Sequence, residues 1–347
     1  MSKFRFEEIA INSTEKKKPV ESDKYTYLGL EHLDPGTLKV SRFGSDVAPI
    51  GEKLVMKKGD VLFGKRRAYQ KKVAIAPFDG IFSAHGMVLR PKTEVIDSEF
   101  FPLFISSDYF LDAAIKISVG SLSPTINWKD LKNLEFELPD LETQRQLAKV
   151  LWALIDTIEN YKTLMTKTDE LVKSQFIELS KSGRKCLIRE LCTPFSSNLL
   201  INKLQDNNGQ YPLYGATGIV KGIDFYRQED PYLSIIKWGA GVGRVELHEG
   251  KSSIVGSLQG IIPNDGVDIN WLYYALKYSD LAKYATNTTV PNLYFKDYGE
   301  LELIYPENMQ KEIVSFLKQS DKSKFELENC IKNAVSMYKK ILKEYLG

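Results

Sequence analysis

The chain has 347 residues, which indicates two domains at roughly 100 to 200 residues per domain. Its 43% hydrophobic and 27% charged residues exclude a disordered or collagen-like chain, and no apolar run is long enough for a membrane span or a signal peptide, so we expect a cytoplasmic protein without a membrane partner. A net charge of +2 argues against binding nucleic acid by bulk charge alone, and three cysteines and three histidines without a CxxC support neither a disulfide framework nor a metal site.

Residues 1–140 are predicted to form a small domain rich in strands. Short apolar runs separated by Gly, Pro, Asn and Asp are typical of strands. We expect strands at 61–65, 72–76 and 85–90. The apolar spacing over 98–115 then predicts one amphipathic helix.

The most strongly charged segment of this first domain is KRRAYQKK, residues 65–72. It follows a predicted strand and a glycine, which indicates an exposed hairpin tip. Guanidinium and amide groups can read base edges and ammonium groups suit phosphates, although most charge runs are simply solvated. The candidate contact residues are Lys65, Arg66, Arg67, Tyr69, Gln70, Lys71 and Lys72.

A long helix is predicted over residues 142–180. Apolar residues repeat there at intervals of seven, which is typical of a helix that packs along its length on another helix. At ~1.5 Å per residue such a helix is roughly 58 Å long. The repeated residues are Leu151, Ile158, Met165, Val172 and Leu179.

Residues 183–305 form a second segment with the same organisation. We expect strands at 232–238 and 253–257 and one amphipathic helix over 270–285. Charges between residues 221 and 251 cancel, so the candidate contact surface there is aromatic and rich in glycine, over 211–222 and 237–244.

The sequence contains no complete catalytic motif. The glycine-rich segment KWGAGVGR, residues 237–244, is followed by strand and turn composition, so no helix N-terminus is expected to receive a cofactor phosphate. EDPYL, residues 229–233, has one proline where base methyltransferases have two, and the E-x-K at 249–251 lacks the upstream Pro-Asp of a nuclease magnesium site. We therefore expect a non-catalytic chain.

A second long helix is predicted over about 309–346. Its apolar residues at intervals of seven include Leu317, Ile331 and Tyr338, whereas Ser320 and Lys324 are polar and suggest a break or a register marker. An apolar helix face is unstable in water, so we expect the two long helices to pack on each other within one chain. Two separate oligomerisation helices are the alternative.

An internal repeat relates the two halves of the chain. Residues 124–139 and 291–306 align at a constant offset of 167 with six identities, including both framing prolines. The alignment then continues with the second copy one residue shorter, so that Gln144 aligns with Gln310. The expected fold is α+β, with two small strand-rich domains of mixed α/β character that alternate with two long helices. These helices would pair as an antiparallel coiled coil with pseudo-twofold symmetry. The expected boundaries are 1–140, 141–182, 183–305 and 306–347.

Taken in this order, these segments resemble the specificity subunit of type I restriction-modification systems. Residues 59–76 and 82–91 look like part of one group of target-recognition domains, and 211–226 looks like a common opening of such a domain. The stretch LPDLETQRQLAKVLWALID is similar to the central conserved region, although Thr143 separates the usual Glu-Gln pair. The C-terminal copy departs further, because it lacks the Ile before Asp321.

The resemblance implies a non-catalytic subunit in which each domain reads one half of a bipartite, asymmetric site in double-stranded DNA. The helices would set the spacer and dock methyltransferase subunits, two of them, and restriction (translocase) subunits would join. No cofactor is expected in this chain, since S-adenosylmethionine, ATP and Mg²⁺ belong to the partners. The implied contacts are Lys65, Arg66, Arg67, Tyr69, Gln70 and His85 for one half-site, and Tyr214, Lys221, Lys237, Trp238 and Arg244 for the other.

Two other functions remain open at this point. The chain could be a coiled-coil scaffold or adaptor whose basic hairpin is incidental. It could also be an orphan or phase-variable recognition subunit that serves a methyltransferase only.

Overall fold

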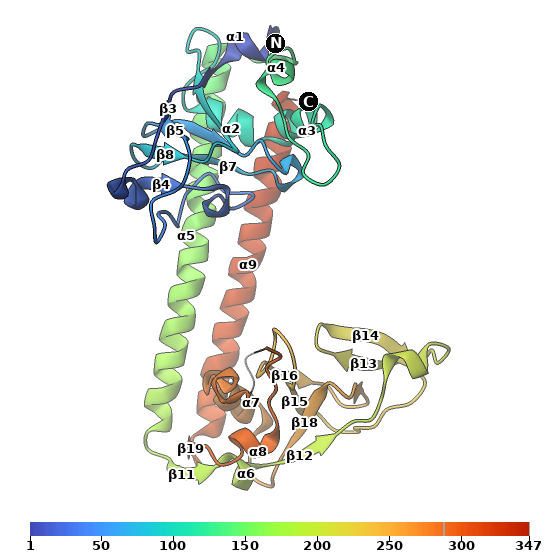
Figure 1. Cartoon of the computed structure of the whole chain (residues 1–347). Coiled ribbons are helices and arrows are strands. Elements are labelled where there is room, and N and C mark those ends of the chain that lie inside the picture. Colours follow the sequence, from blue (N-terminus) through green and yellow to red (C-terminus); the bar gives the residue numbers. More distant parts are fainter. Residues whose placement is uncertain (287–288, 347) are drawn as a thin grey trace. The chain divides into compact units, whose positions relative to one another are not determined.

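The structure is a computed structural model that describes residues 1–286 and 289–346. It divides into two compact units, residues 1–162 with 329–347 and residues 163–328 (Figure 1). Each unit contains one strand-rich domain and one half of each long helix. The α+β class with two strand-rich domains, expected from the sequence, is confirmed.

In the first unit a four-stranded antiparallel sheet carries the predicted basic hairpin. Its apolar strands pair in the order β2-β9-β6-β7, with Val61 facing both Leu89 and Ile75 across the sheet. A second four-stranded sheet has the order β3-β5-β8-β4, and β1 pairs with β10 just before the long helix. The strands are β1 (Ser2–Arg5), β2 (Ala10–Ser13), β3 (Lys16–Lys17), β4 (Tyr27–Leu28), β5 (Lys53–Met56), β6 (Val61–Phe63), β7 (Val73–Ile75), β8 (Gly80–Phe82), β9 (Met87–Pro91) and β10 (Glu135–Leu138).

The single helix predicted over residues 98–115 is wrong, because the structure has two helices there, α2 (Phe100–Ser106) and α3 (Asp108–Lys116). Ser107 between them has an extended backbone. Its hydroxyl accepts a hydrogen bond from the Phe110 N–H at 3.3 Å and donates one to the Phe104 carbonyl at 2.6 Å. Serine thus ends one helix and caps the next. Two single-turn helices, α1 (Phe6–Ile9) and α4 (Trp128–Leu131), complete the domain.

The second unit repeats the main sheet and the terminal strand pair of the first, but its second sheet differs. A four-stranded antiparallel sheet has the order β12-β18-β15-β16, and a three-stranded sheet has the order β14-β13-β17. The pair β11–β19 precedes the second long helix as β1–β10 precedes the first. The strands are β11 (Arg184–Leu187), β12 (Cys192–Ser196), β13 (Tyr211–Gly215), β14 (Gly218–Ile223), β15 (Tyr232–Ile236), β16 (Val245–His248), β17 (Ser253–Ile254), β18 (Leu258–Pro263) and β19 (Glu302–Tyr305).

The helix predicted over 270–285 also ends earlier than expected. Helix α7 (Ile269–Tyr278) is followed by a 3₁₀ turn at Leu281–Tyr284. Asp280 lies between them in the left-handed region with φ 50°, a conformation that no helix can contain. The short helices α6 (Ile188–Leu191) and α8 (Phe295–Tyr298) have counterparts in α1 and α4 of the first unit.

The long helices are α5 (Leu141–Ser180) and α9 (Gln310–Leu346), whose limits fall within one residue of the predicted ones. They pair in antiparallel orientation within the chain, so separate oligomerisation helices are excluded. In the first unit, Leu147 and Leu151 of α5 share a core with Leu342 and Leu346 of α9. In the second, the corresponding core residues are Val172 and Phe176 of α5 with Ile313 and Leu317 of α9.

The predicted helix seam is only partly buried. Leu151, Val172 and Leu317 are almost fully buried and Ile158 is 9% exposed. Helix α9 continues through its polar positions without a break, and the Lys324 ammonium forms ion pairs with Asp169 of α5 and, at 3.9 Å, with Asp321. The remaining predicted seam residues are half-buried, namely Met165, Leu179, Ile331 and Tyr338.

Candidate nucleic-acid interface

The basic run of the first domain lies on the tip of the β6–β7 hairpin. The Gly64 N–H donates to the Lys72 carbonyl at 2.9 Å and closes the hairpin, and a 3₁₀ turn, Ala68–Gln70, forms its end. Arg67 and Lys71 on either side of this turn have φ of 54° and 49°, in the left-handed region that few residues other than glycine adopt. The chain reverses its direction within these few residues. Arg66, Arg67 and Tyr69 are exposed as a result, and Gln70 is half-buried.

Two of the five cations in the run are engaged within the domain. The Lys71 ammonium contacts the carboxylates of Asp108 and Asp112 on α3, at 2.6 and 2.7 Å. The Lys72 ammonium donates to the Leu30 carbonyl at 2.6 Å. Because these contacts hold both ammonium groups inward, Lys71 and Lys72 support the hairpin, and Arg66 and Arg67 carry its free positive charge.

The fold gathers further cations around Lys65, Arg66 and His85. Arg66 Nη1 lies 3.3 Å from His85 Nε2, and the Arg66 N–H donates to the His85 carbonyl at 3.2 Å. Burial together with the positive charges of Arg66, Lys65 and Lys53 lowers the pKa of His85. Burial and the charge of Lys16 likewise lower the pKa of Lys65. Lys16 and Lys53, which sequence reasoning missed, come from the paired strands β3 and β5.

A loop at residues 119–125 braces this hairpin. The Ile126 N–H donates to the Lys65 carbonyl at 2.9 Å, and the Ala68 N–H donates to the Pro124 carbonyl at 3.3 Å. Arg66 Nε donates to the Ser123 hydroxyl at 3.1 Å. Leu122 of this loop is 93% exposed. The hairpin and the loop together are called reading head 1 below.

The second domain builds the same arrangement at the turn between β15 and β16. The Leu293 N–H donates to the Lys237 carbonyl at 2.9 Å, and the Gly239 N–H donates to the Pro291 carbonyl at 3.2 Å. Trp238 forms a bridge with Asn292, just as Arg66 does with Thr125 in the first domain. Lys237 and Trp238 therefore occupy the positions of Lys65 and Arg66 in the repeat.

Reading head 2, defined as the turn 237–244 with Pro291–Tyr294, is aromatic rather than basic. Trp238 is 44% exposed, and its indole N–H donates to the Tyr294 hydroxyl at 3.4 Å. Lys237 is buried, which lowers the pKa of its ammonium, and that ammonium lies 5.0 Å from the Trp238 ring centroid. Arg244 pairs with Glu246 at 3.0 Å and donates to the Ala216 carbonyl. Little free positive charge remains.

Lys221 and Tyr214, two contact residues predicted from the sequence, lie outside reading head 2, and their side chains are held by other groups of the second domain. The Lys221 ammonium donates to the carbonyls of Leu204 and Gln205 at 2.6 and 3.1 Å. The half-buried Tyr214 ring packs on the buried His248 ring at a tilt of 39°, with centroids 4.1 Å apart. A strand, β16, follows the glycine-rich turn, as the sequence predicted, so the turn offers no helix N-terminus to a phosphate.

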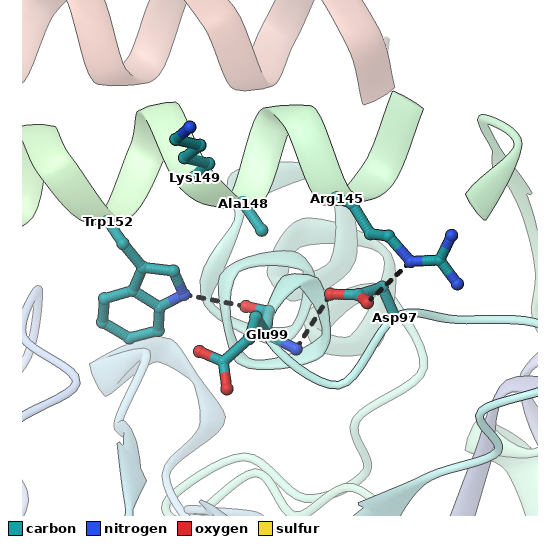
Figure 2. A pocket seen from close by; sticks show the side chains of 6 residues that line it. All are labelled: Asp97, Glu99, Arg145, Ala148, Lys149 and Trp152. Carbon is teal, nitrogen blue, oxygen red and sulfur yellow. Dashed lines mark hydrogen bonds and ion pairs between the residues drawn. The ribbon is translucent and has the colours of Figure 1, made fainter. Parts of the chain in front are cut away.

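Each unit also has a shallow pocket where the first turns of a long helix meet the helix of its domain. In the first unit the pocket has about 300 Å³, and the Trp152 indole N–H donates to the Glu99 carbonyl at 2.9 Å in its wall (Figure 2). Its lining residues are Asp97, Glu99, Arg145, Ala148, Lys149 and Trp152. In the second unit a pocket of about 480 Å³ also lies against the long helix, lined by Asn270 and Tyr273 of α7 and Lys318 and Asp321 of α9, but half of its lining comes from residues 214–248 of the strands.

Within residues 1–286 and 289–346, no group of three or more His, Cys, Asp or Glu side chains could hold a metal ion. Over the same described part of the chain, no helix has the length and apolar character needed to cross a membrane.

Comparison with known proteins identifies two related regions in the chain. Residues 6–167 and 186–337 match the family described as "Type I restriction modification DNA specificity domain". A relative named "Type I restriction enzyme EcoDI specificity subunit" from Escherichia coli is 29% identical over 161 residues, 45% of this chain. That match spans 36% of the relative's length.

Two solved structures share the fold over almost the whole chain. One is the S subunit of a type I restriction-modification system from M. genitalium, with a TM-score of 0.58 and 17% identity, covering 100% of this chain and 96% of that one. The other comes from a study of complex assembly and conformational transition of the type I R-M system, with a TM-score of 0.62 and 19% identity, covering 99% and 97%. At these identities the likeness concerns the fold.

Proposed function

Because the chain belongs to the family of type I restriction modification DNA specificity domains, we propose that it is the non-catalytic DNA-recognition subunit of a type I restriction-modification enzyme. Its two domains each read one half of a bipartite, asymmetric site. The observation that carries this proposal is that both domains hold their reading heads with the same backbone hydrogen bonds but present different side chains there. Two different heads on one scaffold suit two different half-sites.

Reading head 1 suits direct contact with the major groove. Arg66 and Arg67 offer planar donors that match the O6 and N7 acceptors of guanine, and Gln70 can bond adenine. His85 and Ser123 hold the Arg66 guanidinium in place, so less conformational entropy is lost on binding. Lys65, with Lys16 nearby, would contact phosphates. Tyr69, which is 57% exposed, would pack on the backbone or a base.

Reading head 2 suits contacts that depend less on charge. Trp238 and Tyr294 present exposed aromatic surface that can contact thymine methyl groups or an unstacked base. Lys237, Arg244 and Lys221 are held by contacts within the domain, so we assign them the role of shaping the head. Tyr214, packed against His248, has the same role.

The long helices would set the spacer between half-sites and dock two methyltransferase subunits. Four large apolar side chains of α5 stay exposed although the helix already pairs with α9. Exposed apolar side chains of this kind are typical of a surface that binds another protein. The internal repeat, which gives each unit one half of each long helix, supports two copies of one partner. The exposed residues are Val150, Leu164, Leu171 and Ile177.

The reactions of the complex belong to its other subunits. S-adenosylmethionine would be held by the methyltransferase subunits, and ATP and Mg²⁺ by restriction subunits that join them. DNA as the ligand places the assembly in the cytoplasm.

Exchange of one domain tests the proposal. Residues 1–140 are replaced by the corresponding segment of another family member, and the hybrid is expressed with its methyltransferase subunit. Sequencing of methylated adenines in the host DNA is expected to show one changed half-site and one unchanged half-site. If both halves change, or if methylation no longer depends on this chain, the assignment of one half-site to each domain is wrong.

The role of the helices in spacing has its own test. The contact between Asp169 and Lys324 in an antiparallel pair places Thr166 opposite Leu327. Seven residues inserted after Thr166 and seven before Leu327 keep the heptad phase and lengthen both helices by about 10 Å. The preferred spacer is expected to grow by about three base pairs at ~3.4 Å each. An unchanged spacer would remove the helices from this role.

A further inference from the structure

One buried glutamine stands in the first turns of each long helix. Gln144 of α5 is fully buried, and its side-chain oxygen accepts a hydrogen bond from the Asp97 N–H at 2.8 Å. Its amide nitrogen donates to the Pro139 carbonyl at 2.8 Å and to the Val95 carbonyl at 3.1 Å. Both amide protons and the carbonyl oxygen of the side chain are thus hydrogen-bonded within the protein. Because the side chain is buried, water cannot replace these partners.

Gln310 of α9 makes the same connection in the second unit, where its side chain is also buried. Its oxygen accepts from the Asp268 N–H at 2.8 Å. Its nitrogen donates to the Gly266 carbonyl at 3.1 Å and the Tyr305 hydroxyl at 3.0 Å, within reach of the Glu307 carbonyl as well. The connection is therefore present twice, built from residues that are far apart in the sequence.

Each glutamine reaches the residue that caps the helix of its domain. The Asp97 carboxylate accepts from the N–H groups of Glu99 and Phe100 at the start of α2, at 3.0 and 3.2 Å. The Asp268 carboxylate does the same at the start of α7, with Asn270 and Trp271 at 2.8 and 3.2 Å. In both units a chain of hydrogen bonds thus runs from the long helix through an aspartate to the first turn of the domain helix.

The remaining contacts between domain and long helix combine apolar packing with directional contacts that differ between the units. The Trp152 indole N–H donates to the Glu99 carbonyl at 2.9 Å in the first unit, and the Tyr274 hydroxyl donates to the Asp321 carboxylate in the second. Leu147 and Leu151 of α5 share a core with Phe100 and Leu103 of α2. Apolar contact is not directional and tolerates sliding, whereas hydrogen bonds weaken steeply when their geometry changes. The glutamine contacts are therefore the buried directional contacts that both units share, and they favour one orientation of each domain on its helix.

We propose that Gln144 and Gln310 are positioning residues that fix the angle of each recognition domain on its long helix, and that they thereby restrict the half-site spacing that the subunit accepts. This inference rests on the proposed function. It assigns no DNA contact to either glutamine.

The test measures spacer tolerance in the full chain with its methyltransferase subunits. Gln144→Met and Gln310→Met keep the length of the side chain and remove its hydrogen bonds. Binding is measured on duplexes that keep both half-sites and vary the spacer one base pair at a time. Wild type is expected to discriminate against a spacer changed by one base pair, and each variant is expected to lose about tenfold of that discrimination. Sensitivity to a single base change within a half-site should persist.

Gln146→Met is the matched control, because Gln146 is an exposed neighbour on α5 whose side-chain amide donates to Glu142 of the same helix at 3.2 Å. It is expected to leave the spacer profile unchanged. A lower melting temperature with an unchanged spacer profile in both variants would overturn the inference and leave a purely structural role. If one variant fails to fold, the other repeat carries the test. If the wild-type complex shows no site-specific binding, the proposed function itself fails.

Discussion

In the first domain the segment after β6 carries Lys65 and Arg66, whereas in the second the segment after β15 carries Lys237 and Trp238. Both segments are held by backbone donors, Ile126 in one domain and Leu293 in the other, that bond the lysine carbonyl. Backbone hydrogen bonds place few demands on side-chain identity. The scaffold can therefore keep its geometry while the side chain that it presents at this position changes from guanidinium to indole.

The largest expected effect comes from removing the free charge of reading head 1. Arg66→Ala with Arg67→Ala should lower affinity for the DNA site on the order of 1,000-fold, since each well-placed arginine is worth roughly 1–3 kcal/mol. The slope of log K against log salt should also become shallower. Equilibrium binding at several salt concentrations measures both.

The control for this charge removal is Lys57→Ala with Lys58→Ala, an exposed pair of the same domain outside the hairpin. It should change affinity far less. Equal losses from the two double variants would mean that only general charge matters, and no loss from either would favour the scaffold function.

Lowering the pH should destabilise the second domain more than the first. Burial lowers the pKa of His248 in the second domain to about 4, whereas an unfolded histidine titrates near 6.5. Between pH 6.5 and pH 4 the unfolded state therefore binds a proton at His248 that the folded state does not bind. The contribution of the neutral imidazole to stability is complete above pH 6.5 and is lost as the pH falls toward 4. The full window is worth about 3 kcal/mol.

Hydrogen exchange in the full chain at pH 7 and pH 5 checks this acid effect. Protection factors, corrected for the intrinsic exchange rate at each pH, should fall from pH 7 to pH 5 in β15 and β16 much more than in β6 and β7. His248→Gln should remove most of the pH dependence, even if it lowers stability at both pH values. A pH dependence that survives the substitution would point to other groups.

The aromatic head should respond differently to truncation. Trp238→Ala is expected to cost about tenfold in affinity, because aromatic contact with a base is worth roughly 1–3 kcal/mol. The salt slope should stay as in wild type, since no free cation is removed. Trp238→Phe should retain most of the affinity. A salt slope that falls as it does for the arginine variant would erase the distinction between the heads.

The smallest effect is expected at Lys71. Its ammonium already pairs with Asp108 and Asp112, so Lys71→Ala should change DNA affinity within about twofold and stability by less than about 1 kcal/mol. Arg67→Ala, four residues earlier on the same hairpin, is the comparison in the same binding assay. A loss at Lys71 as large as that at Arg67 would show that the ion pairs open on DNA.

The fold could be predicted in outline because its strongest signals are periodic. The heptad series and the repeat at an offset of 167 located α5 and α9 within one residue and implied their pairing. The interruptions at Ser107 and Asp280 could not be predicted from apolar spacing, which continues through both positions. They depend on local cap and backbone conformations.

The site was predicted in part for a related reason. Lys65 and Arg66 were marked by charge, and Lys237 and Trp238 by glycine and aromatic content, all local properties. The inward use of Lys71 depends on acidic residues about forty positions later, and the approach of Lys53 depends on the pairing of β5. Such contacts are set by tertiary structure, so a charge run overestimates the free charge of a hairpin.

The first compact unit is assembled from both ends of the sequence, with Leu342 and Leu346 completing the core around Leu147 and Leu151. During translation, residues 1–162 therefore leave the ribosome before residues 329–347, which complete their core, and the whole second unit is synthesised in between. At roughly 5–20 residues per second this delay is on the order of 10–40 s. During that time the first domain exposes apolar surface to chaperones and to neighbouring chains. A truncated mRNA that ends before the codon for residue 329 yields a chain in which this surface stays exposed.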